Sequence, residues 1–88
     1  EIEVRNINEL EEVLSHGGVD RILFDNFTPI ELTKGLSKVT ENIETEASGG
    51  ITKETIRDYA LTGVEYISVG ALTHSYTSLD MSLKVAIT

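Results

Sequence analysis

The sequence predicts an α/β fold in which short parallel strands alternate with helices. Four β-prone segments recur at intervals of about 20–23 residues, which is the length of one strand–loop–helix–loop unit. Each segment is followed by a stretch that carries signals for the start or the end of a helix. The four segments are Ile2–Val4, Ile22–Phe24, Ile43–Ala47 and Tyr66–Val69.

The second and fourth segments are the most continuously apolar of the four. Parallel strands have this composition when helices cover the sheet, because both faces of each strand are then buried. Parallel neighbours are joined by right-handed crossovers in nearly all folds. We therefore expect Ile22–Phe24 and Tyr66–Val69 to be parallel strands buried beneath helices.

The first helix is expected between the first two strands. Asn8 is its expected N-cap, with Glu11 at the third helical position, in the pattern of a capping box. Gly17 and Gly18 are expected to end it, because glycine tolerates the left-handed conformation found after helices.

The second helix has the stronger start, at Thr28–Glu31. Threonine caps it, proline occupies a position that needs no amide donor, and the glutamate returns to the cap. A third helix is expected to open at Thr52, to bury Tyr59 and to close at Gly63. After the fourth strand, the chain is expected to run as a loop through Thr73–Ser75 towards a final apolar stretch, Leu79–Ile87.

Two architectures fit this pattern equally well, an open doubly wound sheet and part of a (β/α) barrel. Four strand–helix units are about half of an eight-fold barrel, which typically has about 250 residues. A half barrel leaves two strand edges unpaired and would therefore need a partner.

Composition excludes several classes of function. The 88 residues include 15 acidic and 7 basic side chains, giving a net charge of -8. Such a chain is disfavoured as a partner of nucleic acid or of an anionic membrane surface. Cysteine is absent, which excludes disulfides, thiolate metal sites and cysteine nucleophiles. We expect a reducing compartment and a cytoplasmic location.

Glycine-bearing segments follow the third and fourth strands, at the strand ends where both candidate folds bind ligands. Ser48, Gly49 and Gly50 combine a hydroxyl donor with amides that an anion can approach closely. Gly70 follows the next strand and again permits close approach of the backbone, and His74 supplies a side-chain donor. Simple βα turns are the alternative, but two such loops together favour a phosphate site.

Three carboxylates lie on the predicted strands or at their ends. Asp25 closes the second strand, Glu3 lies within the first, and Glu46 lies within the third. A buried carboxylate is costly unless it is paired, hydrogen-bonded or bound to a cation. Taken singly, Asp25 is better explained as a turn carboxylate and Glu3 as a solvated edge residue, and Glu46 fits an ordinary strand acid.

Three motifs resemble the quinolinate phosphoribosyltransferase family, also called nicotinate-nucleotide pyrophosphorylase (carboxylating), in order and spacing. They are Leu23–Phe27, Glu46–Ile51 and Val69–Ser75. Glu1–Val4 is similar to the Glu-x-Glu-Val strand that precedes them in that family, and Leu79–Leu83 is similar to its C-terminal stretch. The resemblance covers nearly the whole chain.

This resemblance implies a reaction of NAD biosynthesis. Quinolinate and phosphoribosyl pyrophosphate would give nicotinate mononucleotide, pyrophosphate and carbon dioxide, with Mg²⁺ required. The family fold is an N-terminal α/β sandwich followed by an incomplete (β/α) barrel of an atypical TIM type, assembled as a homodimer. Residues 1–88 would be the C-terminal half of that barrel, and the N-terminal domain and the first part of the barrel would be absent from the sequence.

The resemblance also implies roles for individual residues. Glu3 and Asp25 resemble the catalytic acids that face the ribose hydroxyls and the Mg²⁺–pyrophosphate region, which makes them indirect metal partners. The residues assigned to the 5-phosphate group of the substrate are Ser48, Gly49, Gly50, Gly70 and His74.

One departure from the family pattern concerns quinolinate itself. The family's basic cluster that grips its two carboxylates lies before the matched region, and none of the seven lysines and arginines here matches it. A dianionic substrate needs such donors, so this stretch alone is expected to be inactive. Two alternatives remain: a related transferase such as the molybdenum-transport-associated homologue, and a non-catalytic half-barrel assembly module.

Overall fold

A computed structural model describes residues 1–40, 42–69, 72–76 and 83–87. They form one six-stranded sheet and three helices. The strands follow one another across the sheet in chain order, from β1 to β6. In order, the elements are β1 (Ile2–Val4), α1 (Ile7–His16), β2 (Arg21–Asp25), α2 (Pro29–Leu36), β3 (Glu44–Ser48), α3 (Ile56–Ala60), β4 (Tyr66–Val69), β5 (Leu72–Tyr76) and β6 (Leu83–Ile87).

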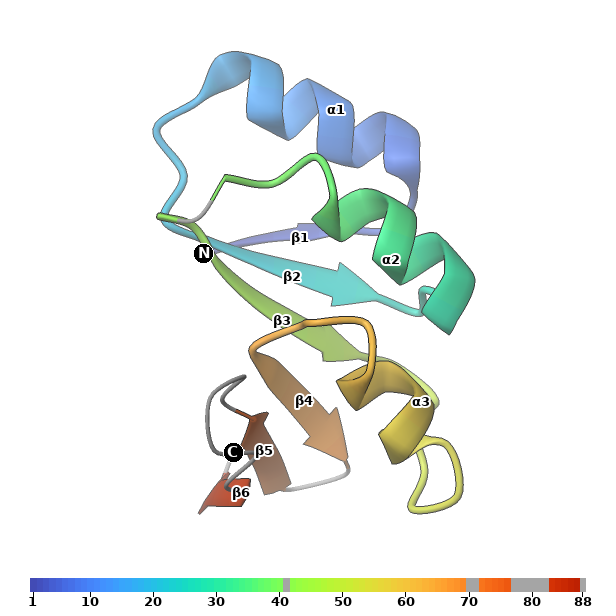
Figure 1. Ribbon diagram of the computed structural model, residues 1–88. Coiled ribbons are helices and arrows are strands. Elements are labelled where there is room, and N and C mark those ends of the chain that lie inside the picture. The colour runs from blue at the N-terminus through green and yellow to red at the C-terminus, as the bar shows by residue number, and fades with distance from the viewer. Residues whose placement is uncertain (41, 70–71, 77–82, 88) are drawn as a thin grey trace.

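The four predicted parallel strands are confirmed, and their order separates the two architectures. Strands β1 to β4 are parallel neighbours in sequence order, whereas a doubly wound sheet reverses its strand order at a switch point. Consecutive helices contact each other, α1 with α2 and α2 with α3. Figure 1 shows the three helices in a row along one side of these strands. This part of the chain therefore has the topology of a barrel segment.

The core lies between this row of helices and the sheet. On β2 the buried residues alternate with half-buried ones, so only one face of the strand is covered. The expectation that this strand is buried on both faces is therefore wrong for the described residues. The apolar residues that make up the core are Val4, Leu10, Ile22, Phe24, Phe27, Leu32, Ala47, Ile51, Tyr59, Val64 and Ile67.

The first helix starts two residues earlier than predicted. Asn6, not Asn8, is the N-cap, and its side chain accepts a hydrogen bond from the Glu9 amide at 2.8 Å. Glu9 in turn accepts from the Arg5 amide at 2.7 Å. The same cap pattern occurs at both positions, and the earlier one is used because β1 already ends at Val4.

The second helix confirms its predicted capping box. The Thr28 hydroxyl accepts from the Glu31 amide at 3.2 Å, and the Glu31 carboxylate accepts from the Thr28 amide at 3.0 Å. The third helix is shorter than predicted and begins at Ile56, with Thr55 as its N-cap. Thr52 precedes it in a turn, where its amide donates to the Thr55 hydroxyl at 3.0 Å.

The expected loop at Thr73–Ser75 is instead part of β5. This strand runs antiparallel to β4, with His74 opposite Ile67. Of the predicted final stretch, residues 83–87 form β6, antiparallel to β5, and 79–82 lie outside the described residues. The added strands give partners to the backbone groups on the far edge of β4. Within the described ranges, no helix is long and apolar enough to cross a membrane.

Candidate functional site

The candidate site occupies the face of the parallel strands that the helices leave uncovered. Side chains alternate along a strand, so the residues between the buried ones point to this face. Those on β2 to β4 are mostly polar: Arg21, Leu23, Asp25, Glu44, Glu46, Ser48, Tyr66 and Ser68. Their charged and hydroxyl groups lie on one surface, which we call the concave face after the interior of a barrel.

At the carboxyl ends of β2 and β3, two loops are locked together. Asp25 and Ser48 are register partners, and the Asn26 amide donates to the Ser48 carbonyl at 2.8 Å. Asn26 and Gly49 both have positive φ, 63° and 89°. A Cβ at position 49 would lie 2.8 Å from both the Asn26 amide nitrogen and Asp25 Oδ1. Only glycine therefore permits this approach.

This geometry gives the predicted phosphate loop a defined shape. Gly50 follows Gly49 with φ also positive, at 70°, and successive amides in turns of this kind make concavities for anions. The Ser48 side chain is half-buried at the start of the loop. The helix expected to open at Thr52 does not bring its N-terminal dipole to this loop, because α3 starts only at Ile56 and has five residues.

The two predicted catalytic acids lie on this face but do not contact each other. Glu3 pairs in register with Leu23, so Asp25 lies two residues further along the neighbouring strand, about 6–7 Å nearer the carboxyl ends. Glu3 makes an ion pair with Arg5 at 3.8 Å. Asp25 lies against the backbone of Gly49, directly beside the candidate phosphate loop.

The second predicted phosphate loop is only partly described. Gly70 lies outside the described residues. His74 lies in β5, in the same row of the sheet as Ala47 and Ile67, so its backbone is two strand spacings from β3, about 10 Å. The structure therefore joins Asp25 with Ser48 and Gly49, and leaves the assignments of Gly70 and His74 to phosphate as predictions.

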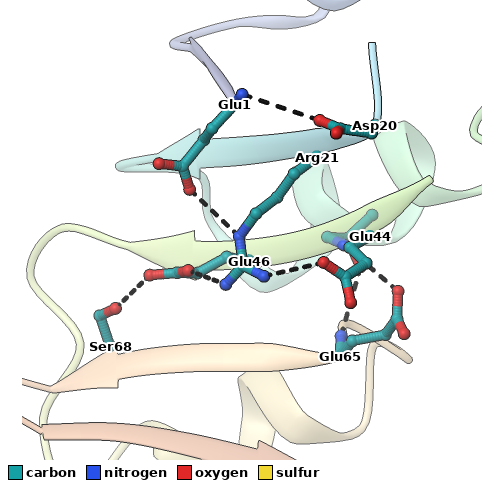
Figure 2. Close-up of polar contacts among 8 residues, drawn as sticks. Glu1, Asp20, Arg21, Glu44, Glu46, Glu65 and Ser68 are labelled. Carbon is teal, nitrogen blue, oxygen red and sulfur yellow. Dashed lines mark hydrogen bonds and ion pairs between the residues drawn. The ribbon is translucent and has the colours of Figure 1, made fainter. Parts of the chain in front are cut away.

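Sequence reasoning missed an arginine on the concave face, at the start of β2. Figure 2 shows Arg21 reaching towards three glutamates. Its guanidinium lies 3.2 Å from Glu1, 3.0 Å from Glu44 and 2.5 Å from Glu46, and it stacks 4.5 Å from the ring centroid of Tyr66. The hydrogen bond to Glu46 raises the pKa of Arg21, although burial acts in the opposite direction.

The same carboxylate of Glu46 continues the network to β4. The Ser68 hydroxyl donates to its second oxygen, as Figure 2 also shows. Alternation of charged and small residues in Glu44–Ser48 was the one feature of the sequence that could have indicated a polar inner face. The partners could not be foreseen, because they lie 22 to 25 positions apart in the chain.

A buried tyrosine ties the third helix to the loop that follows Asp25. The Tyr59 hydroxyl donates to the Phe27 carbonyl at 2.7 Å. Burial, and secondarily the charge of Glu31, raise the pKa of Tyr59 above its ordinary value of 10.0. The sequence predicted Tyr59 as a core residue, and the structure adds this fixed contact behind the site.

A magnesium site is compatible with the carboxylates of this face. Among the described residues, no group of three or more acidic or histidine side chains is arranged so that it could hold a metal ion. Mg²⁺ is commonly held by only one or two carboxylates together with substrate phosphates and water. Asp25 supplies oxygen ligands of that kind beside the candidate phosphate loop, and Glu3 supplies them on the neighbouring strand, further from the carboxyl ends.

Comparisons with known proteins agree with this arrangement. The family described as quinolinate phosphoribosyl transferase, C-terminal domain, matches residues 1–84. A probable nicotinate-nucleotide pyrophosphorylase (carboxylating) of Bacillus subtilis is 46% identical over 88 residues, which cover 99% of this chain and 30% of that protein. Its counterpart in Methanocaldococcus jannaschii is 43% identical over 93 residues, covering 97% of this chain and 32% of that protein.

Among solved structures, a nicotinate-nucleotide pyrophosphorylase from Ehrlichia chaffeensis superposes with a TM-score of 0.70 at 43% identity. The match covers 77% of this chain and 24% of that one. The sequence therefore spans about a third of the length of the curated relatives that it matches.

Proposed function

This chain belongs to the quinolinate phosphoribosyltransferase family, whose C-terminal domain it matches, and from that premise we propose its function. It forms the second half of the barrel of an enzyme that transfers a ribosyl phosphate group from phosphoribosyl pyrophosphate to quinolinate. The products are nicotinate mononucleotide, pyrophosphate and carbon dioxide. A preceding domain and barrel half, a homodimeric assembly and a cytoplasmic location belong to the same proposal.

The observation that carries the proposal is the lock between the loops after β2 and β3. It holds a carboxylate, Asp25, against the glycine of an anion-binding turn, Gly49. A phosphorylated sugar needs both features within one ligand's length, since its phosphate requires donors and its ribose carries hydroxyls and the reacting carbon. The geometry supports a site for a ribose 5-phosphate group.

In the proposed mechanism, Ser48 and the amides around Gly49 and Gly50 bind the 5-phosphate and fix the position of the ribose. Departure of pyrophosphate develops positive charge on that ribose. The carboxylates of Asp25 and Glu3 stabilise this charge electrostatically, because they are held in place before the reaction. Mg²⁺, when bound near these two carboxylates, would neutralise charge on the leaving pyrophosphate.

Quinolinate is proposed to be held by residues outside this sequence. On the concave face, Arg21 and Arg5 already pair with glutamates. Lys34 and Arg57 lie on helices that cover the other face of the sheet, and Lys38 lies in the turn that follows α2. In the family that the sequence resembles, the basic cluster that holds the two carboxylates of quinolinate lies before the region matched here, so we expect this chain to be inactive alone.

The test uses the full-length gene product with quinolinate, phosphoribosyl pyrophosphate and Mg²⁺, with nicotinate mononucleotide measured by chromatography. Ser48→Ala is expected to raise the KM for phosphoribosyl pyrophosphate about tenfold, the cost of one charge-assisted hydrogen bond. Asp25→Asn is expected to lower kcat about a hundredfold. Ser15→Ala, on the exposed side of α1, serves as the matched control and leaves both constants unchanged.

The same assay addresses the remaining predictions and alternatives. His74→Ala raises the KM for phosphoribosyl pyrophosphate if that residue is a phosphate ligand, and an unchanged KM removes the assignment. Transfer to another acceptor with no turnover of quinolinate would favour the related transferase associated with molybdenum transport. Absence of any transfer, together with a stable dimer that does not bind ribose 5-phosphate, would favour the assembly module.

A further inference from the structure

A chain of polar contacts crosses the concave face from β2 to β4, below the candidate phosphate loop. Arg21 on β2 donates to one carboxylate oxygen of Glu46 on β3 at 2.5 Å. Ser68 on β4 donates to the other oxygen. Figure 2 shows the glutamate between these two partners, so a single carboxylate links three adjacent strands.

This carboxylate lies close to the place where a phosphate group would bind. Glu46 and Ser48 are on the same face of β3, two residues or about 6–7 Å apart. Glu46 pairs in register with Tyr66, and continuing that register places Ser68 level with Ser48. The Glu46 side chain therefore extends towards the strand ends, and its hydrogen-bond partner lies beside the first residue of the loop.

The position creates an electrostatic conflict for the proposed site. The Glu46 side chain is only 13% exposed, so water screens its charge poorly. A bound phosphate dianion would lie within one Debye length, about 10 Å at 0.1 M salt, and an unpaired carboxylate there would repel it. In the described part of the chain, Arg21 is the cation that pairs with Glu46.

The geometry indicates that Glu46 is the main partner of Arg21. Glu1 and Glu44 also contact the guanidinium, but at 3.2 and 3.0 Å and with side chains that are 52% exposed. Exposed ion pairs contribute little, whereas a partly buried pair leaves an uncompensated charge if one partner is removed. Loss of Arg21 would therefore act mainly through Glu46.

We propose that Arg21 is a positioning residue of the phosphate site. It neutralises the Glu46 carboxylate and holds it against the Ser68 hydroxyl. The surface next to Ser48–Gly50 therefore does not repel the phosphate dianion of the substrate. This inference rests on the function proposed above and adds to it a residue that does not touch the substrate.

The test compares charge variants of the full-length gene product. Arg21→Met is expected to raise the KM for phosphoribosyl pyrophosphate about tenfold, equivalent to about 1.4 kcal/mol, with kcat changed less than about twofold. Glu46→Gln removes the repelling charge and is expected to lower the KM. The double variant with Arg21→Met and Glu46→Gln is expected to recover most of the loss, and Arg21→Lys to be intermediate.

The control is Lys38→Met, which removes an exposed ion pair with Glu11 at 3.3 Å on the helical side and leaves the KM unchanged. Recovery by the double variant separates the two possible roles of Arg21. If Arg21 only supported the fold, Arg21→Met would lower the melting temperature. Adding Glu46→Gln would then remove a second polar group and would not restore the KM.

If the wild-type enzyme transfers ribosyl phosphate to quinolinate, either of two results would overturn the inference about Arg21. One is an unchanged KM in Arg21→Met, and the other is a KM in Glu46→Gln raised as far as in Arg21→Met. If wild type transfers no ribosyl phosphate, the proposed function fails instead. Calorimetric titration with ribose 5-phosphate then tests Arg21 directly, since Arg21→Met must weaken that binding and the double variant must restore it.

Discussion

The two faces of the same parallel strands have opposite characters. On β2, Ile22 and Phe24 point towards the helices and are completely buried. The alternate residues of this strand, Arg21, Leu23 and Asp25, point to the concave face and remain partly exposed. Side-chain alternation along a single strand thus separates the residues that hold the fold from those that could bind a ligand.

This difference indicates that the two faces of the sheet have separate roles. The helical face stabilises the fold, and the concave face carries the groups that could bind a ligand. The helical side excludes water and packs closely: a Cβ at Gly35 of α2 would lie 3.1 Å from the ring of Phe24. The concave side instead holds glutamates against an arginine and places Asp25 beside Gly49. Substitutions on the two faces should therefore differ in kind, with unfolding dominating on one side and ligand affinity on the other.

The largest effect is expected for Phe24→Ala, which leaves a cavity beneath α2 and removes an edge-to-face contact with Phe27 at 5.2 Å. The free energy of unfolding should fall by about 3–5 kcal/mol. Leu23→Ala, one residue away on the other face, should cost on the order of 1 kcal/mol. Urea denaturation followed by circular dichroism measures both, and equal losses would contradict the division by face.

The next largest effect is expected at the contact between the loops after β2 and β3. Alanine substitutions at two glycines with different surroundings test this contact. Gly49 and Gly63 both have φ near +90°, but a Cβ at Gly63 meets nothing within 4 Å, whereas one at Gly49 collides with Asn26 and Asp25. Alanine at either position should cost roughly 1–3 kcal/mol of stability through backbone strain. Only Gly49→Ala should also raise the KM for phosphoribosyl pyrophosphate, by about tenfold or more.

Kinetics of the two variants at a temperature where both remain folded provide the measurement. An equal rise in KM for both glycines would mean that the change acts through general loosening of the fold. A rise confined to Gly49 would tie affinity to the contact between the β2 and β3 loops.

The sequence predicted the parts of the molecule that depend on neighbours along the chain. The capping box at Thr28 and Glu31 is local, and it was predicted correctly. The cap of α1 is also local, yet two equivalent patterns start at Asn6 and Asn8, and only the end of β1 decides between them. Local rules thus predict that a helix exists and leave its first residue open.

Parts that depend on pairing across the sheet could not be predicted. β5 forms by antiparallel pairing with β4, although its sequence also fits a loop. Gly49 was predicted as a binding residue from its position after a strand. Its close approach to Asn26 could not be predicted, because Asn26 belongs to another loop. The Arg21–Glu46 pair needs the register of β2 with β3, which no local pattern specifies.

The smallest effect concerns Tyr59, which belongs to the helical side yet supports the concave side. Tyr59→Phe keeps the buried ring and removes the hydrogen bond to the Phe27 carbonyl, so the free energy of unfolding should fall by about 1 kcal/mol. Because Phe27 directly follows Asp25 and Asn26, a small rise in KM for phosphoribosyl pyrophosphate should accompany the loss. Thr62→Ala, which removes a partly buried hydroxyl that donates to the Tyr59 carbonyl and accepts from the Val64 amide, is the control for the affinity change.

The pH dependence of this variant gives a separate check. The pKa of Tyr59 is raised in the folded protein, so above pH 10 the unfolded chain loses this proton more readily than the folded one. The contribution of Tyr59 to stability is therefore complete below its unfolded pKa and is lost as the pH rises through its folded pKa. The stability difference between wild type and Tyr59→Phe should shrink over that range in urea titrations. A constant difference would show that the hydroxyl is not buried in the contact with Phe27, and would leave the helical face without its link to the site.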